Sequence, residues 1–236
     1  MSISQAEDRV KIPNPATKVL KYSPSDGDFK EYNSETKEKV SHNKIKVLVL
    51  DIVSQIAGWD SVTDTSIYSN QIHNSTSEEM YVRNGNGDVL AKGLYSAIKV
   101  GIKDRGAKFN SIFYCLLLKD DLVDSLIRVA FQGAGLTSIV EAKIRAGDFL
   151  EIEKGEQQKK GSVKFYVPKV TKVERNNDLL EVGKKIDREQ LVPYFESLKY
   201  TPKEVIEEAV VKTLTSQTQN KLPEINLEDI NVAMPF

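Results

Sequence analysis

The chain has 236 residues and a formal net charge of −1, with 33 Lys and Arg side chains against 34 Asp and Glu. This length allows one domain with a full hydrophobic core, and the charge balance argues against a histone-like binder. The apolar neighbours of Cys115, the single cysteine, predict a buried thiol and exclude an intrachain disulfide. No apolar run approaches the roughly 20 residues that span a bilayer, and no apolar signal core begins the chain. We therefore expect an intracellular protein without membrane contact.

Residues 1–12 are polar, and we expect them to be flexible. Pro13 and Pro15 disfavour a helix and predict an extended segment, because proline lacks the backbone donor and restricts the residue before it. Residues 18–22 and 29–32 flank a Ser-Pro-Ser-Asp-Gly turn. They predict two short strands or an edge hairpin.

The longest apolar run, residues 45–59, predicts the central strand of the fold. It is rich in β-branched residues and ends in Trp59, the only tryptophan, so we expect a strand buried on both faces. Farther along, Gly-Asn-Gly-Asp at 85–88 separates two short runs of β-forming residues, 80–84 and 89–93. Because Gly and Asn tolerate positive φ, this stretch predicts a hairpin.

The remaining chain mixes apolar strands with short helices. Further strands are predicted at 67–72, 109–118, 148–153 and 162–174, the last two joined by a flexible, charged Gly-Glu-Gln-Gln-Lys-Lys-Gly tip. Helices are predicted at 94–102, 122–130, 136–145, 191–198 and 201–214. The first has apolar residues spaced by four, the second follows an N-cap at Asp120-Asp121, and the last follows a Thr-Pro-Lys-Glu capping box. Because strands and long helices do not alternate regularly, we expect antiparallel pairing.

Catalytic and metal-binding constellations are incomplete throughout the sequence. His42 and His73 lie in polar stretches without Cys, Asp or Glu at metal-ligand spacing, so surface histidines are the simpler interpretation. Residues 101–108 approximate a phosphate-binding loop, but the lysine is displaced by one position. Ser96 and Lys99 have the spacing of an acyl-transfer pair without its partner motifs. We expect a protein that is not an enzyme and that holds neither a metal nor a cofactor.

Aromatic and basic side chains are interleaved, and the basic ones concentrate in residues 99–108 and 159–172. Single-stranded nucleic acid is bound by aromatic faces that stack on bases and by cations that meet phosphates. The competing interpretation places the aromatic rings in the core and the lysines on a solvated surface. The predicted nucleic-acid contacts are Trp59, Tyr68, Arg83, Lys92, Lys99, Lys103, Arg105, Lys108, Tyr114, Lys160, Lys164 and Tyr166.

Residues 222–236 have no periodicity, carry a small net negative charge and end in phenylalanine. Such a peptide can dock into a basic-rimmed pocket of another protein or compete for its own cationic groove. A terminal segment without function is the alternative. The predicted partner-binding residues are Glu228, Asp229, Ile230, Met234, Pro235 and Phe236.

Three features together resemble the single-stranded DNA-binding proteins of tailed bacteriophages. The first is Asn-Pro-Ala-Thr-Lys-Val-Leu from Asn14, followed by Gly-Asp-Phe. The second is Ile-Ala-Gly-Trp-Asp around Trp59, followed by Ile-Tyr-Ser-Asn, Tyr-Val-Arg, Ala-Lys-Gly and Ile-Lys. The third is the tail that ends in Pro-Phe. The resemblance covers residues 13–175 and the tail, although this tail is less acidic than usual and the helices at 187–216 are additions.

The resemblance implies a β-rich α+β fold, an OB-fold-like antiparallel barrel with inserted and C-terminal helices. The expected organisation is a flexible N-terminus at 1–12, an OB-fold-like single-stranded DNA-binding domain at 13–185, a helical extension at 186–216 and a disordered acidic tail at 217–236.

The implied function is sequence-independent binding and protection of single-stranded DNA during phage replication or recombination, in the cytoplasm of the infected bacterial host. The tail would recruit phage or host replication and recombination proteins, and self-association is left open. The alternative is a protein-interaction or virion-associated module that docks through its tail and C-terminal helices without touching DNA. The near-neutral charge favours this alternative, whereas the interleaved cations and aromatics favour DNA binding.

Overall fold

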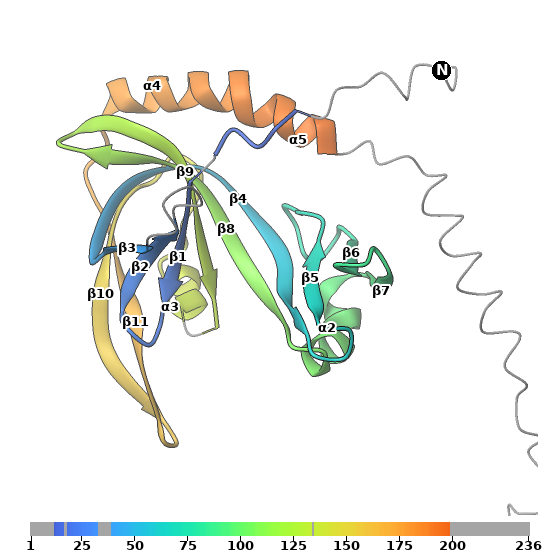
Figure 1. The fold of residues 1–236 in the computed structure, drawn as a ribbon. Coiled ribbons are helices and arrows are strands. Elements are labelled where there is room, and N and C mark those ends of the chain that lie inside the picture. The colour runs from blue at the N-terminus through green and yellow to red at the C-terminus, as the bar shows by residue number, and fades with distance from the viewer. Residues whose placement is uncertain (1–11, 17, 33–38, 134, 199–236) are drawn as a thin grey trace, which may run out of the picture. The chain divides into compact units, whose positions relative to one another are not determined.

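The computed structural model describes residues 12–16, 18–32, 39–133 and 135–198 (Figure 1). The strands are β1 Lys18–Ser23, β2 Asp28–Tyr32, β3 Lys39–His42, β4 Lys44–Asp60, β5 Thr65–Ser69, β6 Met80–Asn84, β7 Val89–Gly93, β8 Ala107–Lys119, β9 Leu122–Gln132, β10 Phe149–Lys160 and β11 Val163–Lys172. The helices are α2 Tyr95–Asp104, α3 Gly135–Glu141, α4 Asn177–Ile186 and α5 Val192–Leu198, and the π-helical turn η1 Asp187–Leu191 joins the last two.

The sheet is organised around β4, the 17-residue strand that the apolar run predicts. The first half of β4 pairs with β10 and β8, and its second half pairs with β8 and β5. The described strands form one 11-stranded sheet in the order β3-β2-β1-β9-β8-β4-β5-β6-β7, from which the β10–β11 hairpin branches at β4. Pairing is antiparallel except between β1 and β9. The predicted β-rich fold with mainly antiparallel pairing is therefore confirmed.

The predicted barrel is not closed. β11 pairs as a strand with β10 alone, and the path through the described strands ends at β3 and β7. Between the β1–β2 turn and β11 there is a single backbone hydrogen bond, from the N–H of Tyr166 to the carbonyl of Pro24 at 2.7 Å. The β1–β2–β3 segment thus stands beside the hairpin without extending the ladder.

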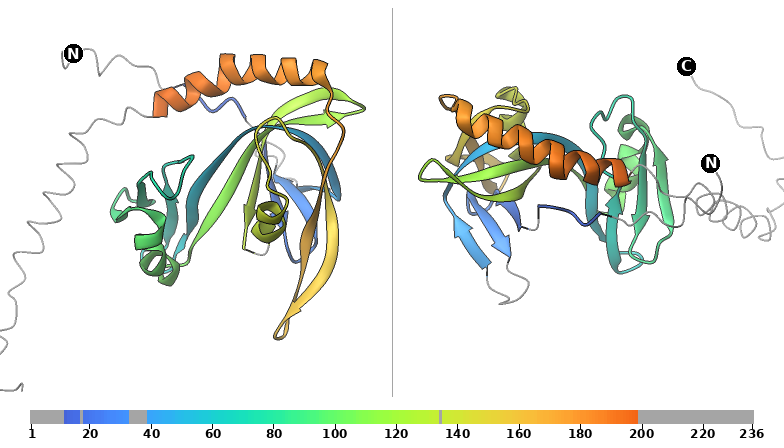
Figure 2. Two further views of the ribbon diagram at one scale, coloured as in Figure 1. Left: turned by 180° about the vertical axis from the view of Figure 1, so that it is seen from behind. Right: turned by 90° about the horizontal axis from the view of Figure 1, so that it is seen from above.

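The core lies on both sides of β4 and β8. On one side, Val47, Phe113 and Phe131 belong to a cluster that β1, β2 and β10 complete. On the other side, α4, η1 and α5 run as one helical segment over the strands (Figure 2). This segment buries Leu180 and Leu191 against the sheet, so the predicted apolar stripe at 191–198 has a partner within the same fold.

The prediction of a helix at 122–130 is wrong, because this segment forms the strand β9. Asp120 and Asp121 adopt φ values of 50° and 58°, which is the backbone of a two-residue type I′ hairpin turn rather than of a helix N-cap. Beyond the turn, Ile127, Val129 and Phe131 alternate into the core. Pairing with β8 on one side and β1 on the other decides the conformation.

Other boundaries differ by shorter distances. The segment at 155–160, predicted as a flexible tip, continues β10, because cross-strand pairing with β11 persists to Lys160. α3 ends at Glu141, earlier than predicted, and α4 already begins at Asn177, where the Asn176 side chain accepts a hydrogen bond from the Leu179 N–H. Of the N-terminal segment predicted at 1–12, residues 1–11 lie outside the described residues, as do the predicted helix at 201–214 and the tail.

Candidate nucleic-acid interface

The surface of interest is one side of the sheet where β8, β4, β5 and β6 lie next to one another (Figure 1). Lys108 pairs with Ala57, Ala57 with Tyr68, and Tyr68 with Arg83. Directly opposed residues of antiparallel strands point to the same side of a sheet. These side chains therefore form one row across four strands.

Strand alternation adds two more aromatic rings to this side. Trp59 lies two residues beyond Ala57 on β4, and Tyr81 lies two residues before Arg83 on β6, so both rings share the side of Tyr68. The three rings thus descend diagonally over β6, β5 and β4, one strand and two residues at each step. We call this side of the sheet the open face and define it by Trp59, Tyr68, Tyr81, Arg83, Lys92 and Lys108.

The opposite side of the same strands is covered by α2. Ile102 of α2 is buried in a cluster with Ile56 and Val82, whose side chains alternate with those of the open face. Lys99 and Lys103 are exposed on α2, and they consequently lie across the sheet from Tyr68. The basic region predicted at 99–108 is therefore divided between the two sides of the sheet.

The aromatic rings of the open face are accessible. Trp59 is 57% exposed and Tyr68 is 42% exposed. Tyr81 is half-buried and has the Lys92 ammonium 5.0 Å from its ring centroid, a cation–π arrangement. Lys92 also lies 3.9 Å from a carboxylate oxygen of Glu79, so its charge is partly balanced.

Arg83 and Lys108 supply the unbalanced charge of the open face. Lys108 is exposed and Arg83 is half-buried. Within the part of the chain that the structure describes, neither side chain forms an ion pair. They lie at the same level of the sheet on either side of Tyr68. If a nucleic-acid base stacked on the Tyr68 ring, the phosphates next to that base would come close to these two cations.

Farther along the same side of the sheet, α5 covers the strands (Figure 2). Tyr114 is fully buried there, with ring centroids 6.3 Å from Tyr194 and 5.2 Å from Phe195. Its hydroxyl accepts a hydrogen bond from Asn14 Nδ2 at 3.1 Å and donates one to Gln71 Oε1 at 2.9 Å. Tyr114, a predicted contact, therefore presents no ring face to a base in this structure.

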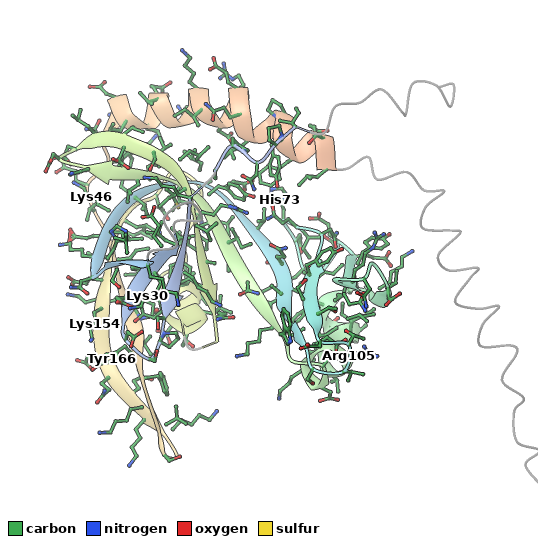
Figure 3. All side chains as sticks on the ribbon, viewed as in Figure 1. Lys30, Lys46, His73, Arg105, Lys154 and Tyr166 are labelled. Carbon is green, nitrogen blue, oxygen red and sulfur yellow. The ribbon has the colours of Figure 1, made fainter. Side chains whose placement is uncertain are left out.

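Arg105 faces a carboxylate rather than solvent alone. Its Nη1 donates to Asp60 Oδ2 at 3.1 Å, and Asp60 is fully buried. Figure 3 labels Arg105 at the end of the sheet that carries β5 and α2. The backbone N–H of Val62, the hydroxyl of Thr63 and the Arg105 guanidinium lower the pKa of Asp60. The stabilisation from this carboxylate is therefore present above its usual pKa of 3.8 and is lost as the pH falls through the lowered value.

The second predicted basic region occupies the β10–β11 hairpin, which Figures 1 and 2 show well separated from β5–β7. Lys160 and Lys164 are exposed near its turn, and Lys164 pairs directly with Lys159. Tyr166 is half-buried, and the Lys154 ammonium lies 3.8 Å from its ring centroid (Figure 3). One face of the Tyr166 ring is thus already occupied.

Polar residues next to the open face were absent from the predicted contacts. Asn110 pairs with Gln55 and Gln132, so three amide side chains form the next row of the sheet between the aromatic rings and α5. Tyr81 was missing as well. The alternation of Met80-Tyr-Val-Arg-Asn would have assigned Tyr81 to the side of Arg83, whereas only the strand register places the amides beside the rings.

Comparison with protein families, curated proteins and solved structures found no match to this chain. Among the described residues, no helix is long and apolar enough to cross a membrane. Within the same ranges, no group of three or more His, Cys, Asp or Glu side chains could hold a metal ion. The predicted partner-binding residues at 228–236 lie outside the described part, so the open face is the main candidate site.

Proposed function

We propose that the protein binds single-stranded DNA on the open face. The observation that carries this proposal is the presence of three accessible or partly accessible aromatic rings and three cations on one side of a sheet. Aromatic rings stack on any base, and cations meet any phosphate, so such binding does not depend on sequence. A duplex keeps its bases stacked on one another and cannot offer their faces to these rings.

The diagonal arrangement suits an extended strand. Diagonal neighbours on adjacent strands are about 7–8 Å apart, so Trp59, Tyr68 and Tyr81 can each meet one of three successive bases. Each stacked base contributes about 1–3 kcal/mol to binding. Arg83 and Lys108, on either side of Tyr68, would then meet the phosphates that connect these bases.

The connectivity supports an OB-type assignment for part of the sheet. In order, β4, β8, β9, α3, β10 and β11 form three antiparallel strands, a helix and a hairpin, with β4 paired to both β8 and β10. An OB-fold has five strands and binds oligonucleotides through strands 2 and 3 and the loops after strands 1 and 4. In this assignment β5–β7 and α2 occupy the first loop, and Lys160 and Lys164 flank the second.

We infer a role in phage DNA replication or recombination from the resemblance described above, with the tail at 228–236 recruiting other replication proteins. The alternative is docking of a partner through the tail and the C-terminal helices. The described helices offer less apolar surface for it, because α4, η1 and α5 bury Leu180, Leu191 and Tyr194 against their own sheet. A protein partner on the open face is the outcome that the binding experiment must separate from DNA.

The test is fluorescence anisotropy of a labelled oligo-dT titrated with the full chain, with a duplex of equal length as the control. We expect binding of the single strand that weakens with salt and weak binding of the duplex. Tyr68→Ala should reduce the affinity about 5-fold or more, because one stacked base is lost. Tyr166→Ala is the matched aromatic control and should reduce it less. Absence of single-strand binding at low salt would refute the proposal.

A further inference from the structure

The turn between β4 and β5 holds Trp59 in a defined position. The indole Nε1–H donates to Asp64 Oδ1 at 3.1 Å, and Asp64 adopts a φ of 52°. Trp59 is nevertheless the most exposed aromatic ring of the open face. A large ring that is both exposed and fixed by a hydrogen bond is preorganised for a ligand, since binding then costs less conformational entropy.

The base of this turn is built around Asp60. Its Oδ1 accepts from the Val62 N–H at 3.0 Å, and its Oδ2 accepts from the Thr63 hydroxyl at 3.1 Å and from Arg105 Nη1 at 3.1 Å. Asp60 is fully buried whereas the Arg105 side chain is 41% exposed. Because a buried carboxylate that loses its cation is strongly unfavourable, Arg105 supports the whole turn.

Arg105 reaches Asp60 from the segment between α2 and β8, where two backbones meet closely. A Cβ on Gly58 would lie 2.6 Å from the Gly106 carbonyl oxygen, and one on Gly106 would lie 2.7 Å from that of Trp59. Glycine at both positions therefore allows the Arg105 segment to lie directly against the strand that carries Trp59. Asp60 balances the positive charge of the Arg105 guanidinium, whereas the ammonium group of Lys108 forms no ion pair among the described residues.

We propose that Arg105 is a positioning residue, which holds the Trp59 ring through Asp60, rather than a phosphate contact. The expected effect of Arg105 on affinity rests on the proposed DNA binding, whereas its effect on the position of the Trp59 ring concerns the free protein. Because Trp59 is the only tryptophan, fluorescence excited at the red edge of the absorption band, where tyrosine does not absorb, reports on this ring alone.

The experiment compares Arg105→Gln with Lys103→Gln, which removes a neighbouring exposed cation that does not bond the turn. In the free protein, Arg105→Gln should increase both the quenching of Trp59 by acrylamide, a neutral quencher, and the fast component of its anisotropy decay, while Lys103→Gln leaves both unchanged. Thr63→Val is the second variant, since it weakens the support of Asp60 without removing a cation and should act in the same direction. Unchanged Trp59 fluorescence in both turn variants, with circular dichroism confirming the fold, would overturn the inference.

Binding separates positioning from phosphate contact. Arg105→Gln should lower the affinity for oligo-dT about fivefold or more, as the loss of one stacked base does, while the slope of log K against log salt stays as in the wild type. In a Trp59→Ala background the same substitution should change the affinity less than about twofold, since the stacked base is already absent. A slope reduced by about 0.7 would identify a phosphate contact instead and refute positioning. If the wild type does not bind DNA, the proposed function fails while the fluorescence result still decides the role of Arg105.

Discussion

Removing the two unpaired cations of the open face should change the salt dependence of DNA binding by a calculable amount. Binding of single strands weakens with salt with a slope of about −0.7 for each phosphate contact. Arg83→Ala combined with Lys108→Ala removes two contacts, so the slope should become less steep by about 1.4. Between 50 and 200 mM salt, the affinity difference between wild type and variant should shrink about sevenfold.

The assay is an anisotropy titration of oligo-dT at several salt concentrations, and the chain offers a matched control. Lys99→Ala combined with Lys103→Ala removes the same charge from α2, on the other side of the sheet. Lys99, Lys103 and Lys108 are exposed and Arg83 is half-buried, so the free energy of unfolding should stay within about 0.5 kcal/mol of the wild type for the α2 variant and fall by about 1 kcal/mol at most for Arg83→Ala/Lys108→Ala. An equal loss of slope in the two variants, or no loss in Arg83→Ala/Lys108→Ala, would refute the assignment of the binding side.

Three further predictions concern stability and reactivity. Tyr114→Ala should lower the free energy of unfolding in urea by about 3–5 kcal/mol, because the ring is fully buried; a loss below about 1 kcal/mol would contradict its place in the core. Gly27→Ala should cost more than about 1 kcal/mol, since φ is +75° and the new Cβ would lie 2.7 Å from Lys154 Cγ; an unchanged denaturation midpoint would disprove this. Burial raises the pKa of the Cys115 thiol, so Ellman's reagent should react with it only on unfolding, and fast reaction of the native protein would be inconsistent with the fold.

The sequence was sufficient to predict elements with one dominant local signal. The apolar run ending at Trp59 could be little other than a strand, and Gly85 with its neighbours requires a turn. The expected burial on both faces holds only for the first half of β4, because Trp59 in the second half is exposed. The segment around Ile127 was ambiguous, because its apolar residues fit a helical spacing as well as alternation. The two aspartates before it suit both an N-cap and a type I′ turn, and only pairing with β8 and β1 distinguishes the two.

The same reasoning explains which site residues the sequence could find. Tyr68, Arg83 and Lys108 are brought together by alternation and register. Lys103 is close to Lys108 in sequence, but α2 and β8 place the two on opposite sides of the sheet. Tyr114 and Tyr68 look alike in the sequence. Tyr114 is a core residue because α5 packs over it, whereas Tyr68 is exposed.

The most direct test of the open face as the binding site is photocrosslinking with an iodouracil-substituted single strand, followed by mass spectrometry of the crosslinked peptides. We predict crosslinks at Trp59, Tyr68 and Tyr81, which an excess of unlabelled oligo-dT should abolish. Crosslinks confined to α2, or to the α4–α5 segment, would contradict the proposal and place the nucleic acid on another surface.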